Sequence, residues 1–176
     1  PPFYLKIHSK IIQSFLPIHN FYFYVNNLNL YTFTKIIKMK ISIINGPNLN
    51  LIGTREPNFY GNQTFDEYFL NLKKRYSNIV FDYFQSNVEG ELINRLQEVG
   101  FTSDLILLNA GGYTHTSVAI GDAIKSIDSS VIEIHITNTF ARDDFRHVSY
   151  ITPVAKGLIV GFGLDSYRMA VESILN

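Results

Sequence analysis

The sequence contains no cysteine, and this absence excludes several kinds of site at once. A chain without a thiol forms no disulfide bond, carries no thiolate nucleophile and offers no cysteine ligand to a metal. The composition is compatible with a reducing compartment, and we therefore expect a cytoplasmic protein.

Long hydrophobic runs and an excess of either charge are missing as well. No stretch reaches the roughly 18 consecutive apolar residues that a membrane-spanning helix needs. The formal net charge is zero, so we expect neither nucleic acid nor an anionic membrane as a partner. Apolar residues make up 46% of the 176 residues and charged residues 17%, which suits one folded domain with a real core.

The first 38 residues lack Asp, Glu, Gly, Ala and Arg, and this composition separates them from the rest. Neither the period of a strand nor that of a helix persists through them. One interpretation is a targeting peptide, since the segment is basic and rich in aromatics. The interpretation that we favour takes Met39, the first methionine, as the true start and residues 1–38 as upstream sequence translated in frame. We therefore expect a single domain at 39–176 and a leader outside it at 1–38.

Strand and helix patterns alternate regularly after Met39. Thr64, with Glu67 three residues later, predicts a capping box at the start of the first helix, and Gly100 closes the second. This alternation is typical of an α/β protein with a five-stranded, parallel, doubly wound sheet, in the flavodoxin-like order 2-1-3-4-5 with helices on both faces. The predicted strands are 40–45, 79–84, 104–110, 131–137 and 157–163, and the predicted helices are 64–76, 88–99, 114–127 and 166–175.

Polar residues gather after three of these strands. The first strand leads into NGPNLNLIGTREPNFYG, the third into NAGGYTHTS and the fourth into ITNTFARDDFRH. In a doubly wound sheet the carboxyl ends of the strands meet at one edge, where ligands bind. No GxGxxG motif follows the first strand and no Walker motif is present, so a nucleotide cofactor has no support. The sequence therefore predicts one polar cleft built from three loops.

Glu133 and His135 lie two residues apart in a predicted strand, so their side chains point to the same face. A carboxylate beside an imidazole fixes its tautomer and raises its pKa, which favours a proton donor near neutral pH. Because isoleucines occupy the alternate positions, only this face of the strand is polar. The alternative is a structural pair that takes no part in chemistry.

His115 follows Gly111 and Gly112 at the start of the predicted helix 114–127. The free N–H groups and the positive dipole end of a helix suit an anionic or hydroxyl-rich ligand. The alternative is that Thr114 caps the helix and that His115 is incidental.

Two pairs of residues in the loops add positive charge to the predicted cleft. Tyr60 titrates near 10 in isolation, so it acts as a base only if a cation such as Arg55 stabilises its phenolate. The loop that carries this pair is placed to act as a lid. Arg142 and Arg146 are spaced to hold a carboxylate or another ligand oxygen. The alternatives are an ordinary exposed loop for the first pair and surface ion pairs for the second.

Other functions remain open on these residues alone. His115, Glu133 and His135 match a metal site with two histidines and one carboxylate, as in a metal-dependent hydro-lyase, although the neighbouring Glu and His favour a hydrogen bond instead. Ser117 with His115 and Asp122 has the members of a hydrolase triad, but no G-x-S-x-G motif is present. A flavodoxin-like binding module without turnover is the alternative from outside the enzymes.

From Met39 to about Leu175 the sequence resembles the type II 3-dehydroquinate dehydratases, also called type II dehydroquinases. The resemblance extends, in the order and at the spacing of the family, through NGPNLNLIGTREPNFYG, QSNVEGELI, LNAGGYTHTSVAI, EIHITNTFARDDFRHVSY and GLIVGFG. It implies that residues 39–176 form a flavodoxin-like catalytic domain that converts 3-dehydroquinate to 3-dehydroshikimate in the shikimate pathway. It also implies trimers assembled into a dodecamer, and no metal, nucleotide or Schiff-base lysine.

The resemblance assigns catalytic roles to five residues. Tyr60 takes the C2 proton of the substrate, and Arg55 supports its phenolate. Asn48 helps to hold a water that stabilises the enolate. His135 protonates the departing C1 hydroxyl, and Glu133 orients His135. These residues supply the base, the enolate stabiliser and the acid that such an elimination requires.

Further positions are assigned by the resemblance to substrate binding. Asn109, His115 and Arg146 act through their side chains, Ile136 and Thr137 through their backbone N–H groups, and Asp122 across a subunit contact. Thr137 stands where the family often has serine, which we expect to have little consequence. Arg142 also matches the family pattern, and we expect it to close over the site.

Overall fold

The computed structural model describes residues 38–53 and 63–175. Residues 1–37 of the predicted leader lie outside the described residues, and so does the segment 54–62, which contains Arg55 and Tyr60. In the part of the chain that is described, no helix is both long and apolar enough to cross a membrane.

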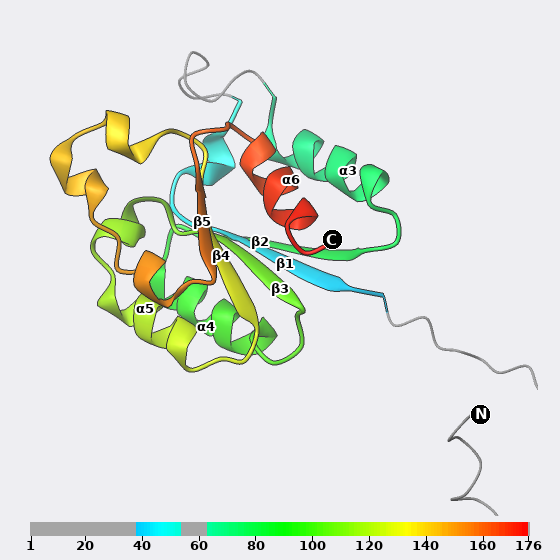
Figure 1. Cartoon of the computed structure of the whole chain (residues 1–176), viewed down its shortest axis with the longest axis horizontal. Helices are drawn as coiled ribbons and strands as arrows, with labels where there is room; N and C mark the ends of the chain where they lie inside the picture. The colour runs from blue at the N-terminus through cyan, green and yellow to red at the C-terminus, as the bar shows by residue number, and fades with distance from the viewer. Residues whose placement is uncertain (1–37, 54–62, 176) are drawn as a thin grey trace, which may run out of the picture. The chain divides into compact units, whose positions relative to one another are not determined.

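Five parallel strands form one sheet in the order β2-β1-β3-β4-β5, as predicted (Figure 1). In the register of this sheet Asn45 pairs with Gln85 on one side of β1 and with Asn109 on the other. The strand order changes direction between β1 and β3, and such a switch point is where doubly wound sheets bind ligands. The strands are β1 (Lys40–Asn45), β2 (Val80–Gln85), β3 (Leu105–Asn109), β4 (Ser130–His135) and β5 (Gly157–Val160).

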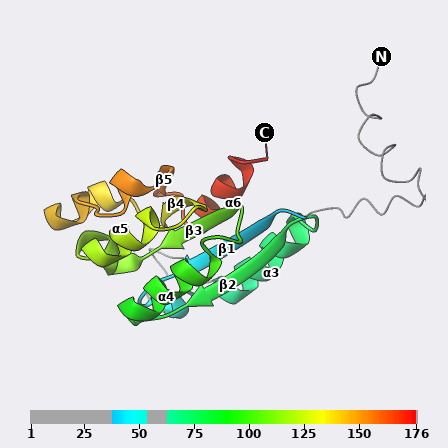
Figure 2. The same ribbon diagram turned by 90° about the horizontal axis from the view of Figure 1, so that it is seen from below.

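Helices cover both faces of this sheet (Figure 2). One face packs against α3 (Phe65–Arg75) and α6 (Asp165–Glu172), and the other against α4 (Glu89–Val99) and α5 (Val118–Lys125). Because both faces are covered, the inner strands are largely apolar, and their buried polar residues include Asn45, Asn109 and His135 at the carboxyl ends. The apolar side chains alternate between the two cores: Ile43 and Leu107 are buried in the first, and Ile44 and Leu108 in the second.

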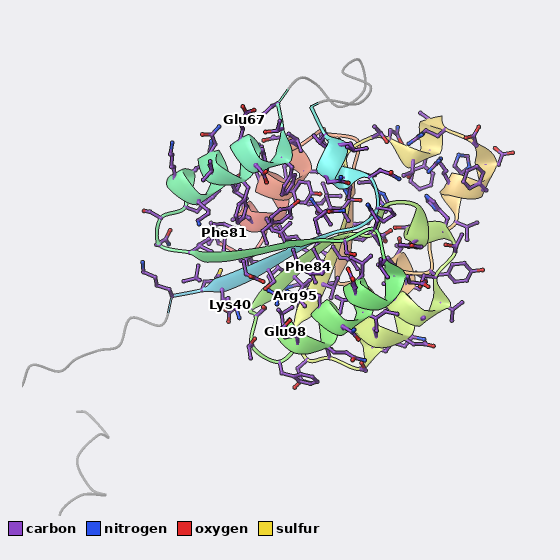
Figure 3. The ribbon with its side chains drawn as sticks, turned by 180° about the vertical axis from the view of Figure 1, so that it is seen from behind. Lys40, Glu67, Phe81, Phe84, Arg95 and Glu98 are labelled. Carbon is purple, nitrogen blue, oxygen red and sulfur yellow. The ribbon has the colours of Figure 1, made fainter. Side chains whose placement is uncertain are left out.

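The capping box predicted at the start of α3 is confirmed. The Thr64 hydroxyl accepts the N–H of Glu67 at 3.2 Å, and the Glu67 carboxylate accepts the N–H of Thr64 at 3.1 Å. α4 ends before Gly100, as predicted. Arg95 of α4 lies over the ring of Phe84 at 5.7 Å, which holds the helix against the edge strand β2 (Figure 3).

The predicted helix 114–127 is wrong at its start. A short 3-10 helix, η3 (Gly111–His115), precedes α5. Ser117, rather than Thr114, caps α5, because its hydroxyl accepts the N–H of Ile120 at 2.9 Å. His115 is therefore the last residue of η3, and the helix-dipole argument for a ligand beside it does not hold.

Candidate active site

A pocket lies at the carboxyl ends of β1, β3 and β4, beside the switch point. The loops that follow these strands form its walls, including η2 (Leu49–Leu51), η3 and η4 (Thr139–Ala141). The three polar loops predicted from the sequence therefore converge on one cleft. The predicted residues that line it are Asn48, Asn109, His115, His135, Ile136, Thr137, Arg142 and Arg146.

Two glycines bring the first two of these loops together. The N–H of Gly46 donates to the carbonyl oxygen of Asn109 at 2.7 Å. A Cβ on Gly46 would lie 2.6 Å from the carbonyl oxygen of Ala110, so a side chain is incompatible with this approach. Gly111 has a φ of +57°, and a Cβ there would meet Pro47 at 3.2 Å. The loops that carry Asn48 and Asn109 are thus held backbone against backbone.

Asn48 adopts a left-handed conformation, with φ 66° and ψ 1°, directly before η2. Asparagine is one of the few residues besides glycine that tolerate this region. The N–H of Asn48 donates to Oδ1 of Asn87 at 2.9 Å, and Nε2 of Gln85 donates to the same oxygen at 3.2 Å. The QSN string at the end of β2 therefore braces the backbone of this pocket residue.

A buried chain of hydrogen bonds fixes the amide of Asn109. Its Nδ2 donates to the hydroxyl of Tyr167 at 3.1 Å, and its Oδ1 accepts the N–H of Gly111 at 3.2 Å. The Tyr167 hydroxyl donates in turn to Oδ1 of Asn45 at 2.7 Å. Burial raises the pKa of Tyr167 far above its usual value, so this hydroxyl keeps its proton. Tyr167, which lies on α6, thereby anchors a residue of the pocket.

The predicted pair of Glu133 and His135 is in direct contact. Nε2 of His135 lies 2.8 Å from Oε1 of Glu133. Glu133 is fully buried, whereas His135 keeps 8% of its surface exposed at the pocket. The two neighbouring strands place Leu108 and Leu158 beside Glu133, so its surroundings on β3 and β5 are apolar.

Glu133 is surrounded by hydrogen-bond donors that compensate for its burial. Ser149 Oγ lies 2.9 Å from Oε1 and 3.2 Å from Oε2, and the hydroxyl of Thr152 donates to Oε2. Burial alone would raise the pKa of Glu133, but the hydrogen bonds from His135, Thr152 and Ser149 together lower it. Glu133 is therefore a carboxylate at neutral pH, and Nε2 of His135 donates a proton to it.

His115 forms the adjacent part of the same wall. Its Nδ1 lies 2.7 Å from the carbonyl oxygen of Val148. A carbonyl only accepts hydrogen bonds, so Nδ1 carries a proton and Nε2 is the nitrogen that can meet a ligand. The rings of His115 and His135 are stacked, with centroids 6.2 Å apart and an interplanar angle of 16°.

Arg142 and Arg146 are the only formally charged side chains among the described residues that line the pocket. Arg142 donates to Oγ1 of Thr137 at 3.4 Å. Nε of Arg146 is buried, and within the described ranges it has no hydrogen-bond partner, since Asp143 is 3.9 Å away. A buried donor that lacks an acceptor costs free energy. The pocket favours an anionic ligand because the two guanidinium groups give its wall a positive charge.

One predicted site residue lies away from this pocket, and two others lie outside the described residues. Asp122 lies on α5, where its side chain is 64% exposed and pairs with Lys125 at 3.1 Å. Tyr60 and Arg55 lie outside the described residues. The alternative metal site is not assembled either, because the described ranges contain no group of three or more His, Asp or Glu placed to hold an ion.

Sequence reasoning missed the residues that support the pocket from behind. Local spacing carries no signal for them, because their contacts join distant segments: Ser149 meets Glu133 across 16 positions and Tyr167 meets Asn45 across 122. The strings QSNVEGELI and HVSY contain some of them, but only as part of a longer resemblance. The missed residues are Asn45, Asn87, Ser149, Thr152 and Tyr167.

The fold and the pocket together define a class of protein: a flavodoxin-like α/β protein with a polar pocket at the switch point of its sheet. A family model described as "Dehydroquinase class II" matches residues 39–175. The chain therefore belongs to the class II dehydroquinases.

Individual relatives agree with this family. A 3-dehydroquinate dehydratase of Prochlorococcus marinus is 47% identical over 139 residues, which cover 78% of this chain and 95% of the relative. One of Fusobacterium nucleatum is 49% identical over 142 residues, with 78% and 97% covered. The crystal structure of a type II dehydroquinase from Butyrivibrio crossotus superposes with a TM-score of 0.73 at 45% identity, covering 78% of this chain and 98% of that one.

Proposed function

We propose that this chain dehydrates 3-dehydroquinate through an enolate, with Tyr60 as the base and His135 as the acid. Through its family the chain is an enzyme with 3-dehydroquinate dehydratase activity (EC 4.2.1.10), a lyase of the shikimate pathway. The observation that carries the proposal for His135 is its 2.8 Å contact with the buried carboxylate of Glu133 at the wall of the pocket.

The acid half of the reaction belongs to His135 and Glu133. Expelling the C1 hydroxyl as water requires a proton, and an imidazolium beside a carboxylate is a suitable donor near neutral pH. Because Nε2 is engaged with Glu133, Nδ1 is the nitrogen that releases the proton to the leaving oxygen. Glu133 keeps its negative charge throughout and stabilises the imidazolium.

The base half belongs to the loop that follows β1. Tyr60, as a phenolate next to the Arg55 guanidinium, removes the C2 proton and generates the enolate. Asn48 helps to hold a water that stabilises the enolate oxygen. Asn48 lines the pocket, and its backbone is braced by Asn87, which supports this role. The roles of Tyr60 and Arg55 rest on the motif REPNFYG.

The remaining pocket residues bind the substrate, whose ring bears a carboxylate and hydroxyl groups. Nε2 of His115 and the amide of Asn109 meet hydroxyl groups, and Ile136 and Thr137 offer backbone N–H groups. Arg146 lines the same pocket and contributes a positive charge that suits the substrate carboxylate. Arg142 closes over the site from the same loop.

One assay tests the reaction and both rival functions. Addition of 3-dehydroquinate to the purified chain is expected to produce the absorbance of the enone product, and exhaustive chelation is expected to leave the rate unchanged. A rate that falls on chelation and returns with a divalent cation favours the metal-dependent hydro-lyase. Absence of enone, with the substrate still bound in a calorimeter, favours the binding module without turnover.

We also propose that the chain assembles as trimers within a dodecamer, with Asp122 entering the site of a neighbouring copy. Asp122 is exposed on α5, where Val118 is also about half exposed, and the half-exposed Tyr150 lies against Gly121 of the same helix. Sedimentation is expected to give the mass of twelve chains. Asp122→Asn is expected to raise KM more than it lowers kcat. A fully active monomer would contradict the assembly.

A further inference from the structure

We propose that the segment Val148–Thr152 fixes the tautomers of both pocket histidines, with Ser149 and Thr152 as positioning residues for His135. This inference rests on the proposed function for the role of His135 in turnover. The proposed function names the histidines but not what fixes their protonation. This inference identifies atoms outside the pocket that determine which ring nitrogen of each histidine faces the substrate.

Ser149 is held so that its hydroxyl can only donate to Glu133. A serine hydroxyl has one proton and two acceptor lone pairs. Its oxygen accepts the N–H of Ile151 at 3.0 Å and the N–H of Thr152 at 2.9 Å, which uses both lone pairs. The single proton is therefore left for the carboxylate, whose oxygens lie at 2.9 and 3.2 Å.

Thr152 completes the arrangement from the other end of the turn. Its N–H is bound to Ser149, and its hydroxyl donates to Oε2 of Glu133. A protonated Glu133 would lose the benefit of both hydroxyl donors, so the pair of hydroxyls favours the ionised carboxylate. With Glu133 ionised, the shared proton stays on Nε2 of His135, and Nδ1 becomes the nitrogen that exchanges protons with the pocket.

The same segment fixes the second imidazole through its backbone. The carbonyl oxygen of Val148, one residue before Ser149, accepts a proton from Nδ1 of His115. The segment is itself tied to η3, since the N–H of Tyr150 donates to the carbonyl oxygen of Thr114 at 2.9 Å. His115 therefore presents Nε2 to the pocket, and His135 presents Nδ1.

The surroundings of Glu133 limit which other groups influence its ionisation. His135 is the only titratable side chain among the described residues that is hydrogen-bonded to it. The neighbouring strands contribute Leu108 and Leu158, which carry no charge. The other charged or titratable side chains of the described pocket wall are His115, stacked on His135, and the guanidinium groups of Arg142 and Arg146.

Three hydroxyl variants test the role in turnover. Thr152→Val keeps the shape of the side chain but removes its donor, and is expected to lower kcat about 10- to 100-fold, as the loss of one hydrogen bond to a charged group does. Thr152→Ser returns a hydroxyl and is expected to restore most of the rate. Ser173→Ala removes a hydroxyl that, among the described residues, bonds to the Ala170 carbonyl oxygen on α6 and lies outside the pocket lining, and is expected to leave kcat unchanged.

The pH profile separates positioning from general destabilisation. The hydroxyl donors help to hold the pKa of Glu133 low, so removing one while burial remains raises that pKa. Activity requires the carboxylate, and in Thr152→Val and Ser149→Ala the fall in kcat/KM toward acidic pH is therefore expected to begin at a higher pH than in the wild type. A variant that is merely less stable would keep the wild-type profile at temperatures where it is folded.

Nitrogen NMR of histidine-labelled protein tests the tautomers without turnover. In the wild type above the imidazole titrations, Nε2 of His135 and Nδ1 of His115 are expected to carry the protons. A His135 ring protonated on Nδ1 would overturn the inference even if the variants do not fold. An active wild type whose Thr152→Val variant matches Ser173→Ala would overturn it as well. A wild type with the expected tautomers but no enone product contradicts the proposed function instead.

Discussion

Replacing His135 with alanine is expected to lower kcat by about 10²- to 10⁴-fold, the usual contribution of one general acid. The variant loses the imidazole that lies 2.8 Å from Glu133 at the wall of the pocket, so the C1 hydroxyl must leave without a positioned proton donor. The rate of enone formation measures the loss. Circular dichroism and a thermal melt check that the fold survives the cavity in β4.

A second measurement on the same variant isolates the step that is lost. If His135 acts only on the leaving group, His135→Ala is expected to keep exchanging the C2 proton of the substrate with deuterated water, because the base is intact. His147→Ala removes an imidazole that does not line the pocket and is expected to stay within a few-fold of the wild type. A His135→Ala enzyme with wild-type turnover would remove the acid assignment.

Replacing Tyr60 with phenylalanine is expected to lower kcat by at least about 10²- to 10⁴-fold while the fold survives, because one oxygen atom is removed from an otherwise similar side chain. Unlike His135→Ala, this variant is expected to lose the exchange of the C2 proton together with the turnover. The two variants therefore divide the reaction into its base and acid halves.

The chain offers a matched control for the loss of a phenol. Tyr76→Phe removes a hydroxyl that donates to Glu172 at 2.7 Å, between α3 and α6 and outside the pocket lining. Its turnover is expected to stay close to that of the wild type. Near-normal activity in purified Tyr60→Phe would remove the base assignment and leave the family membership untouched.

The sheet could be predicted because its signals are local and repeated. β1 is found at 40–45 as predicted, since β-branched residues buried on both faces leave few other conformations. The parallel pairing follows from the strand–helix alternation, whereas the order 2-1-3-4-5 is predicted because five strands in a domain of this length fit it better than a two-lobed dinucleotide fold. α3 begins at its capping box because Thr64 and Glu67 satisfy each other's N–H groups.

The third helix was predicted less well because two conformations compete in the loop before it. The left-handed Gly111 turns the chain into η3, and the Ser117 hydroxyl supplies the cap from which α5 starts. The polar run Thr114–Ser117 contains more than one residue type that caps helices, so the sequence alone does not reveal which of them starts the helix.

The site residues could be predicted because they follow strand ends that meet at one edge of the sheet. The residues that hold them in place by hydrogen bonds could not be predicted. The carboxylate of Glu133 is matched by hydroxyls from a turn 16 to 19 positions later, and no period connects them. Asn87 holds Asn48 across 39 positions in the same way. Such contacts depend on how loops pack, which residue spacing along the chain does not encode.

The anchoring of Asn109 by Tyr167 has a consequence for how a change in α6 reaches the pocket. Tyr167 belongs to α6, the last helix of the domain, whereas Asn45 and Asn109 end the first and third strands. The Tyr167 hydroxyl is the group that joins the two amides. A substitution such as Tyr167→Phe would therefore loosen Asn109 in the pocket from a position on α6, without touching the pocket lining itself.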